Sequence, residues 1–248
     1  MKKILLPVLC LLILAGCTQA PSSPAHTEPT KKPTIYISSQ ISTLSAEDGT
    51  ELFRQKSPEI LLTLQDPAAT QAISKELSQV PAQWTGDLAQ VKEFITETYQ
   101  TGDDWELWFC HIEAQAMRLD EKVVSIYFSC EKFLGGNHPT SLLDCVTYDC
   151  NTAQRLQLED LLAPGHGISE LAAPVNEALA ARKELLYDDY EALVSQMFMN
   201  HGVKGWYLSE NQLCFVFAPY AIGPYASGII TVAVPYEKLN GILLAEYL

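Results

Sequence analysis

The chain has 248 residues, of which 48% are hydrophobic, and it carries 16 Lys and Arg against 30 Asp and Glu. This apolar content is enough for the core of one large domain or two small ones. It excludes a disordered acidic tail, a collagen-like or coiled-coil rod and a small disulfide knot. The net charge of −14 argues against a nucleic-acid-binding surface, because such a surface needs basic residues to displace counterions.

The N-terminus has the pattern of a bacterial lipoprotein signal peptide. Two lysines precede an apolar run over residues 4–15, which is too short to cross a bilayer but suits a signal peptide. The run ends in the lipobox Leu-Ala-Gly-Cys, which predicts cleavage between Gly16 and Cys17 and a diacylglyceryl group on the Cys17 thiol. We therefore expect residues 1–16 to be removed and the protein to be lipid-anchored on the extracytoplasmic face of the bacterial membrane. An ordinary secretory signal with an incidental cysteine is the alternative.

Residues 17–34, which comprise the lipidated cysteine and a proline-rich segment, are expected to form a tether. Residues 18–34 contain four prolines and no aromatic or large aliphatic residue, so they cannot contribute to a core. Cleavage leaves 14 basic and 30 acidic side chains, a net charge of −16, which anionic headgroups repel. We expect the acyl chains to hold the protein to the membrane and the folded part to stand away from it.

The first part of the globular sequence mixes strand and helix patterns. Strands are indicated by alternating or β-rich runs and helices by apolar residues at helical spacing. In chain order the patterns predict strands over 35–42 and 59–65, helices over 66–80 and 87–98, and a long antiparallel hairpin from 105–119 and 123–134.

The second part begins at a Gly-Gly-Asn-His-Pro loop over 135–139, which breaks the second hairpin strand. The remaining patterns predict strand, turn, short strand and helix start over 142–162, helices over 175–187 and 190–198, and strands over 206–220 and 227–239. A short repeat, Pro-Tyr-Ala-Ile-Gly followed by Pro-Tyr-Ala-Ser-Gly, occupies 219–228.

No βαβ rhythm is evident, so the predicted fold class is α+β, with a mainly antiparallel sheet and packed helices. We divide the globular part into two small subdomains of unknown function, residues 35–130 and 131–248.

No catalytic motif or cofactor fingerprint is found. The sequence contains no nucleophile elbow, Walker loop or dinucleotide-binding fingerprint. Its five histidines, His26, His111, His138, His166 and His201, are scattered without metal-ligand spacing. We therefore predict no catalytic residues, no metal and no cofactor. A cell-wall hydrolase is the alternative, and a cluster of His138, Glu131 and Asp144 in one cleft would support it.

Five cysteines remain after processing, an odd number that leaves at least one thiol without an intramolecular partner. If the turn of the predicted hairpin centres on Asp120, Cys110 faces Cys130 at a distance that a disulfide can bridge. Cys145 and Cys150 are a second candidate pair, because they flank four residues.

The residues 133–162 and 206–239 resemble a domain of unknown function in bacterial surface proteins. The resemblance rests on Gly135-Gly136-Asn137-His138 before a strand, on the Leu-x-Asp-Leu type of helix start, and on the double Pro-Tyr segment. Residues 35–130 are similar to the smaller domain that precedes it. Together the pair is similar to the outer part of lysozyme-sensing anti-sigma factors of the RsiV type and to a region upstream of the catalytic domain in peptidoglycan deacetylases of the PdaC type.

The resemblance implies recognition and implies neither signalling nor catalysis. Residues 1–248 include neither the sigma-binding segment and membrane span of the sensors nor the metal-binding catalytic domain of the deacetylases. We expect a non-catalytic binding or sensing module for a cell-envelope ligand, either a cationic protein such as lysozyme or a wall glycan. A structural envelope lipoprotein without a ligand is a further alternative. The candidate binding residues are Gly135, Gly136, Asn137, His138, Tyr220 and Tyr225, for which a purely turn-shaping role is the alternative.

Overall fold

The computed structural model describes residues 32–200 and 202–248, which lie within one compact unit that extends from Lys31 to Leu248. The predicted signal peptide, its cleavage site at Gly16 and Cys17, and residues 18–31 with His26 lie outside the described residues, as does His201. Among the described residues, no helix combines the length and the apolar character needed to cross a bilayer.

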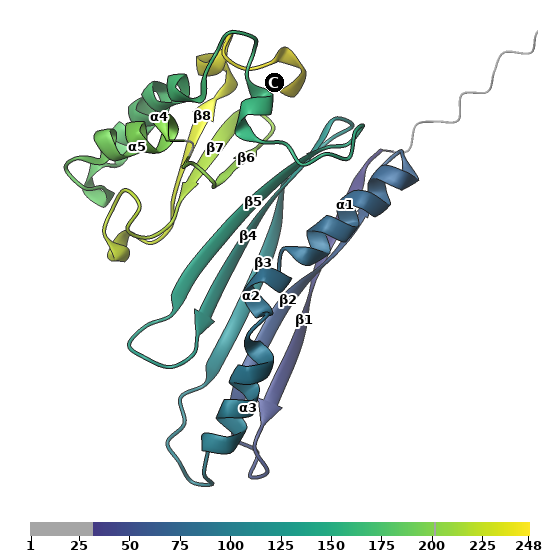
Figure 1. Cartoon of the computed structure of the whole chain (residues 1–248), viewed down its shortest axis with the longest axis vertical. Helices are drawn as coiled ribbons and strands as arrows, with labels where there is room; N and C mark the ends of the chain where they lie inside the picture. The colour runs from purple at the N-terminus through teal and green to yellow at the C-terminus, as the bar shows by residue number, and fades with distance from the viewer. Residues whose placement is uncertain (1–31, 201) are drawn as a thin grey trace, which may run out of the picture. The chain divides into compact units, whose positions relative to one another are not determined.

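The strands form two sheets (Figure 1). The first sheet has the order β1-β2-β3-β4-β5 and contains β1 (Thr34–Ser45), β2 (Glu51–Thr63), β3 (Trp108–Leu119), β4 (Val123–Phe133) and β5 (Thr140–Asp149). The second sheet has the order β6-β7-β8 and contains β6 (Trp206–Leu208), β7 (Gln212–Phe217) and β8 (Ile230–Pro235). The predicted α+β class is confirmed.

One strand pair departs from the antiparallel pattern. β2 and β3 are parallel where Phe53–Lys56 pairs with Trp108–His111, whereas every other pair in the two sheets is antiparallel. Parallel neighbours need a crossover connection. The helices α1 (Pro67–Gln79), α2 (Ala82–Thr85) and α3 (Leu88–Thr98) provide it. The sequence reasoning did not anticipate this crossover.

The crossover helices cover one face of the five-stranded sheet (Figure 1). In α1, Asp66 accepts a hydrogen bond from the backbone N–H of Ala68 at 2.8 Å, and Pro67 occupies the first turn, where it needs no donor. The helix then buries Ala69, Ile73 and Leu77 against the sheet. Leu88 and Ile95 of α3 do the same further along.

The register of the β3–β4 hairpin corrects the predicted pairing of Cys110 with Cys130. The turn is centred between Glu121 and Lys122 and not on Asp120, so Cys110 lies opposite Lys132 and Cys130 lies opposite Ile112. The irregularity between Ala116 and Arg118 moves the partners by only one residue, from Leu119 opposite Val124 to Ala116 opposite Ile126.

The five-stranded sheet also crosses the boundary predicted at residue 130. That boundary falls inside β4, and β5 adds a further antiparallel strand to β4. The first sheet therefore ends at Asp149, and the change to the second sheet comes later in the chain.

The second sheet packs with helices α4 (Ala172–Leu179) and α5 (Tyr190–Met199) around a large apolar core. The helix predicted over 175–187 ends sooner, because the chain passes at Ala180 into a 3-10 helix, η3 (Ala180–Leu185). Further 3-10 helices are η1 (Leu158–Leu161), η2 (Ile168–Leu171), η4 (Tyr225–Ser227), η5 (Tyr236–Leu239) and η6 (Ala245–Tyr247).

The two sheets are joined through buried contacts. Cys145 of β5 packs with Tyr207, Cys214 and Val216 of the second sheet. Nearby, the Ser125 hydroxyl accepts a hydrogen bond from the backbone N–H of Leu208 at 3.1 Å. Buried polar atoms are costly unless paired, so this bond defines one alignment of β6 against the first sheet.

Candidate functional site

The structure brings two of the predicted binding segments together. His138 lies in the loop between β4 and β5, and Tyr220 and Tyr225 lie in the loop between β7 and β8. The His138 and Tyr225 ring centroids are 4.6 Å apart, and those of Tyr220 and Tyr225 are 5.6 Å apart. We call His138, Tyr220 and Tyr225 the aromatic cluster.

A shared acceptor holds the two loops in place. The Tyr225 hydroxyl donates to the Pro139 carbonyl at 3.0 Å, and Nδ1 of His138 lies 3.0 Å from the same oxygen. Because a carbonyl can only accept, the proton of this bond resides on Nδ1 of His138. His138 itself is exposed.

Tyr220 is displayed in an unfavourable backbone conformation. Its φ is +69°, in the left-handed region that non-glycine residues rarely adopt, and 63% of the residue is exposed. Such conformations cost about 1–3 kcal/mol and tend to occur at functional sites. The exposed ring does not offset this cost through burial.

The loop that carries the tyrosines is itself anchored. The Tyr187 N–H donates to the Ile222 carbonyl at 3.0 Å, and the Ser227 hydroxyl donates to the Leu185 carbonyl at 2.8 Å. Asp188 and Asp189, which follow this anchor, are both exposed. These two carboxylates therefore follow in sequence the segment that holds the loop.

The glycines of the first segment have a packing role. Gly135 has a φ of +84°, and a Cβ at this position would lie 2.7 Å from Cζ2 of Trp108. Gly136 has a φ of +105° with open space around it, and Asn137 is exposed. The positive φ values of Gly135 and Gly136 thus set the backbone conformation that places His138 beside Tyr225.

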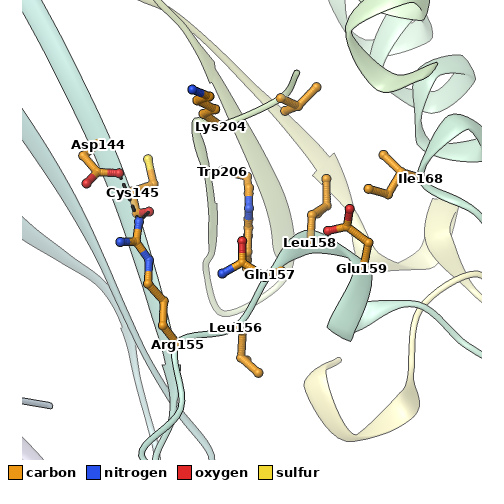
Figure 2. A pocket seen from close by; sticks show the side chains of 11 residues that line it. Asp144, Cys145, Arg155, Leu156, Gln157, Leu158, Glu159, Ile168, Lys204 and Trp206 are labelled. Carbon is orange, nitrogen blue, oxygen red and sulfur yellow. Dashed lines mark hydrogen bonds and ion pairs between the residues drawn. The ribbon is translucent and has the colours of Figure 1, made fainter. Parts of the chain in front are cut away.

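A polar cleft of about 430 Å³ lies beside the first sheet (Figure 2). The Asp144 carboxylate and the Arg155 guanidinium are 3.3 Å apart on one side, and Arg155 also donates to the Cys145 carbonyl at 3.2 Å. Lys204 and Trp206 line the cleft as well (Figure 2). Sequence reasoning missed this cleft, because its walls come from β5, residues 155–159 and residues 203–206.

The cluster that would have supported a hydrolase is not formed. Asp144 pairs with Phe128, which belongs to the helix-covered core, whereas Glu131 lies three positions along β4 and therefore on the other face. Glu131 instead lines a second cavity, of about 290 Å³, with His111. Within residues 32–200 and 202–248, no group of three or more His, Cys, Asp or Glu side chains could hold a metal ion.

His111 has an unusual environment on that second face. Its ring stacks on Phe109 with centroids 4.6 Å apart, and its Nε2 is buried without a hydrogen-bond partner. Burial lowers the pKa of His111, and the positive charges of Arg54 and Lys56 lower it further. His166 lies in a loop, where it contacts Glu170 at 2.9 Å.

The five cysteines of the globular part are free thiols and all are buried. Despite the register shift, the Sγ atoms of Cys110 and Cys130 lie 3.8 Å apart, because the two residues are diagonal neighbours. Burial raises the pKa of Cys145 and of Cys150 to about 12, which leaves both as unreactive thiols at neutral pH. A disulfide between Cys110 and Cys130 stays a prediction.

The segment that holds both tyrosines matches a described family. Residues 159–237 match DUF3298, a protein family of unknown function. The DUF3298 segment contains Tyr220 and Tyr225 of the aromatic cluster, whereas His138 precedes it. No curated protein matches the chain.

Two crystal structures of DUF3298 family proteins resemble the whole globular part. One, from Bacteroides fragilis NCTC 9343, has a TM-score of 0.63 at 14% identity and covers 88% of this chain and 96% of its own. The other, from Pseudomonas aeruginosa PAO1, has a TM-score of 0.56 at 18% identity and covers 89% of this chain and 97% of its own. The similarity shows that the fold is shared with DUF3298 proteins.

Proposed function

We propose that this protein is a lipid-anchored, extracytoplasmic binding module whose aromatic cluster recognises a cell-envelope ligand, and that a cationic protein such as lysozyme is the first candidate. The observation that carries the proposal is the convergence of His138, Tyr220 and Tyr225 at an exposed position. Tyrosine is enriched at the centres of recognition surfaces, since it offers a large contact area at low entropic cost.

The charge distribution supports a cationic partner. The chain has a net charge of −14, and Asp188 and Asp189 follow in sequence the segment that holds the loop of the aromatic cluster. Exposed tyrosine rings attract Arg and Lys side chains, and neighbouring carboxylates add to that attraction. A strongly acidic surface also accelerates the encounter with a basic protein.

A binding titration tests the proposal. Residues 32–248, which comprise the described compact unit, are titrated with lysozyme at low and at high salt. We expect saturable binding that weakens as salt rises. The absence of binding at both salt concentrations would exclude lysozyme, and the same titration with soluble wall glycan fragments would then follow.

Matched variants locate the site. Tyr220→Ala is expected to weaken binding about tenfold, as is typical when a contact tyrosine is truncated. Met199→Ala is the control, because Met199 is equally exposed, at 61% against 63%, but belongs to α5. Equal losses in both variants would contradict a site at the aromatic cluster.

The lipid anchor is tested separately. In cells, Cys17→Ser is expected to release the protein from the membrane fraction, because no thiol then accepts the diacylglyceryl group. Cys10→Ser is the control, since Cys10 lies within the predicted signal peptide. Retention of the Cys17→Ser protein in washed membranes would contradict the lipid anchor.

A further inference from the structure

The strand β1 is an open sheet edge without the usual protection. It is 12 residues long, Thr34–Ser45, and pairs with β2 over this whole length. Natural edge strands are protected from further pairing by charged residues, proline, bulges or short length. β1 has neither a charged residue nor a proline, and its only register irregularity lies at its last residue.

The opposite edge of the same sheet is different. Beyond β5, Arg155 forms an isolated bridge with Tyr148, and its guanidinium donates to the Cys145 carbonyl. The outer backbone of β5 is thus partly occupied by the chain that follows it. β1 is therefore the edge of this sheet that is available to another strand.

Large apolar side chains are exposed along the β1–β2 hairpin. Tyr36 and Ile41 of β1 are each 65% exposed, and Leu61, which lies directly opposite Tyr36 on β2, is 64% exposed. Cross-strand contacts of aromatic and β-branched side chains are what stabilises a strand pair. Another strand beside β1 would pack against Tyr36 and Ile41 and satisfy the outer backbone groups at the same time.

The charges at the two ends of β1 favour a second copy as the partner. Lys32 precedes the strand by two residues, and Glu47 and Asp48 follow it in an exposed turn. When two β1 strands pair antiparallel over their full length, Lys32 of each copy lies beside Glu47 and Asp48 of the other. Between these ends the strand is uncharged, so the pairing brings no like charges of β1 itself into contact.

We propose that the protein forms a twofold-symmetric homodimer by antiparallel pairing of β1 with β1 of a second copy. The pairing joins two five-stranded sheets into one continuous sheet. The twofold axis passes near the middle of the strand, at Ser39 and Gln40, and the interface is isologous, as in most homodimers. The proposal does not depend on the ligand of the aromatic cluster.

Sedimentation equilibrium of residues 32–248 tests the dimer. The wild-type protein is expected to have the mass of a dimer that dissociates on dilution. Ile41→Lys places a charge on the exposed side of β1 and is expected to abolish the dimer over the same concentration range. Met199→Lys is the matched control, because Met199 is 61% exposed on α5, and it is expected to dimerise like the wild type.

A cysteine cross-link tests the geometry. Gln40→Cys places a thiol in the middle of β1, where the two copies are closest, and a short bis-maleimide is expected to link them. Met199→Cys is the control and is expected to stay unlinked. The native cysteines are buried and do not compete.

Three results would overturn the proposal. The first is a wild-type protein that stays monomeric at every concentration. The second is an Ile41→Lys protein that dimerises as strongly as the wild type. The third is a Gln40→Cys protein that the bis-maleimide links no better than it links Met199→Cys. Circular dichroism shows whether the Ile41→Lys protein is folded, and we expect a folded monomer.

Discussion

His138 and Tyr225 donate hydrogen bonds to one oxygen atom, the carbonyl of Pro139, each at 3.0 Å. The two residues come from different loops, and only Tyr225 belongs to the DUF3298 segment. A carbonyl has two lone pairs and can accept both bonds. The loop after β4 is thereby aligned with the loop after β7, and the exposed Tyr220 ring is placed 5.6 Å from Tyr225.

Replacing Tyr220 separates its contribution to stability from its contribution to binding. Tyr220→Gly relieves the positive φ, so the free energy of unfolding is expected to stay constant or rise by up to about 1 kcal/mol. Tyr220→Ala keeps the strain and is expected to be less stable than Tyr220→Gly. Both variants lose the ring and are expected to bind lysozyme about tenfold more weakly. Urea denaturation measures stability, and a Tyr220→Gly protein less stable than Tyr220→Ala would show that the positive φ at this position does not strain the fold.

Gly135 is expected to be the less replaceable of the two adjacent glycines. Gly135→Ala combines a positive φ with a close approach of Cβ to the Trp108 ring, and should cost about 2–4 kcal/mol. Gly136→Ala meets open space and should cost only the backbone term, about 1 kcal/mol. Thermal denaturation compares the two variants, and equal losses would refute the packing role of Gly135.

The contacts of Arg118 make the fold sensitive to acid. Arg118 donates to the Tyr247 carbonyl at 2.6 Å, and its Nε lies 2.6 Å from an Asp120 carboxylate oxygen. Burial by itself raises the pKa of Asp120, but hydrogen bonds from the backbone of Val123 and from Arg118 outweigh it, and the net pKa is lowered. A lowered carboxyl pKa stabilises the fold above the unfolded value of about 3.9, and this stabilisation is lost as pH falls through the folded value. Asp120→Asn is therefore expected to reduce stability at pH 7 and to flatten its loss below pH of about 4. If the free energy of unfolding of this variant falls with pH as steeply as that of the wild type, carboxyl groups other than Asp120 cause the acid sensitivity.

His111 is expected to produce a second pH dependence, at higher pH. Because its pKa in the folded protein is below the ordinary 6.5, the unfolded chain takes up a proton first as the pH falls. The free energy of unfolding is thus expected to decrease as the pH falls from about 6.5 to the pKa of His111 in the folded protein. Below that pKa, His111 causes no further decrease. His111→Phe, which keeps a ring against Phe109, should remove this part of the profile. Denaturant titrations between pH 5 and 8 are the measurement, and an identical profile in the variant would contradict it.

The reactivity of the five thiols is expected to follow their burial and the distances between their sulfur atoms. In the folded protein a maleimide should label none of the five buried cysteines, and unfolding should expose all of them. An added oxidant that accepts two electrons should link Cys110 to Cys130, with loss of two hydrogens, since their sulfurs are 3.8 Å apart. Peptide mapping under non-reducing conditions identifies the product. A link between Cys145 and Cys150 instead would contradict this geometry.

Elements with strong local patterns could be predicted from the sequence. The stripe Ala69, Ile73 and Leu77 predicted α1, and the two β-rich runs around Asp120 predicted the β3–β4 hairpin. Both depend on spacing within one segment, which is the information that periodicity contains.

Features that depend on distant segments could not be predicted. The residue on which the β3–β4 turn centres has no clear local sequence signal, and its shift from Asp120 places Cys110 opposite Lys132. The candidate residues His138 and Tyr225 were selected from a family resemblance, but their mutual contact depends on the packing of both sheets. The cleft beside Asp144 and Arg155 was missed for the same reason.

The parallel pairing of β2 with β3 has a consequence for how the chain reaches this fold. The pairing joins Phe53 to Trp108, 55 positions apart, and extends over four residue pairs. The β1–β2 hairpin and the β3–β4–β5 meander need only local contacts and can form early, whereas pairing over a long separation is slow. Until it closes, the apolar side chain of Phe53, fully buried in the native state, stays in water. We expect the formation of this β2–β3 pairing to limit the folding rate. A chain in which the pairing has not yet formed exposes apolar side chains and is therefore prone to aggregation.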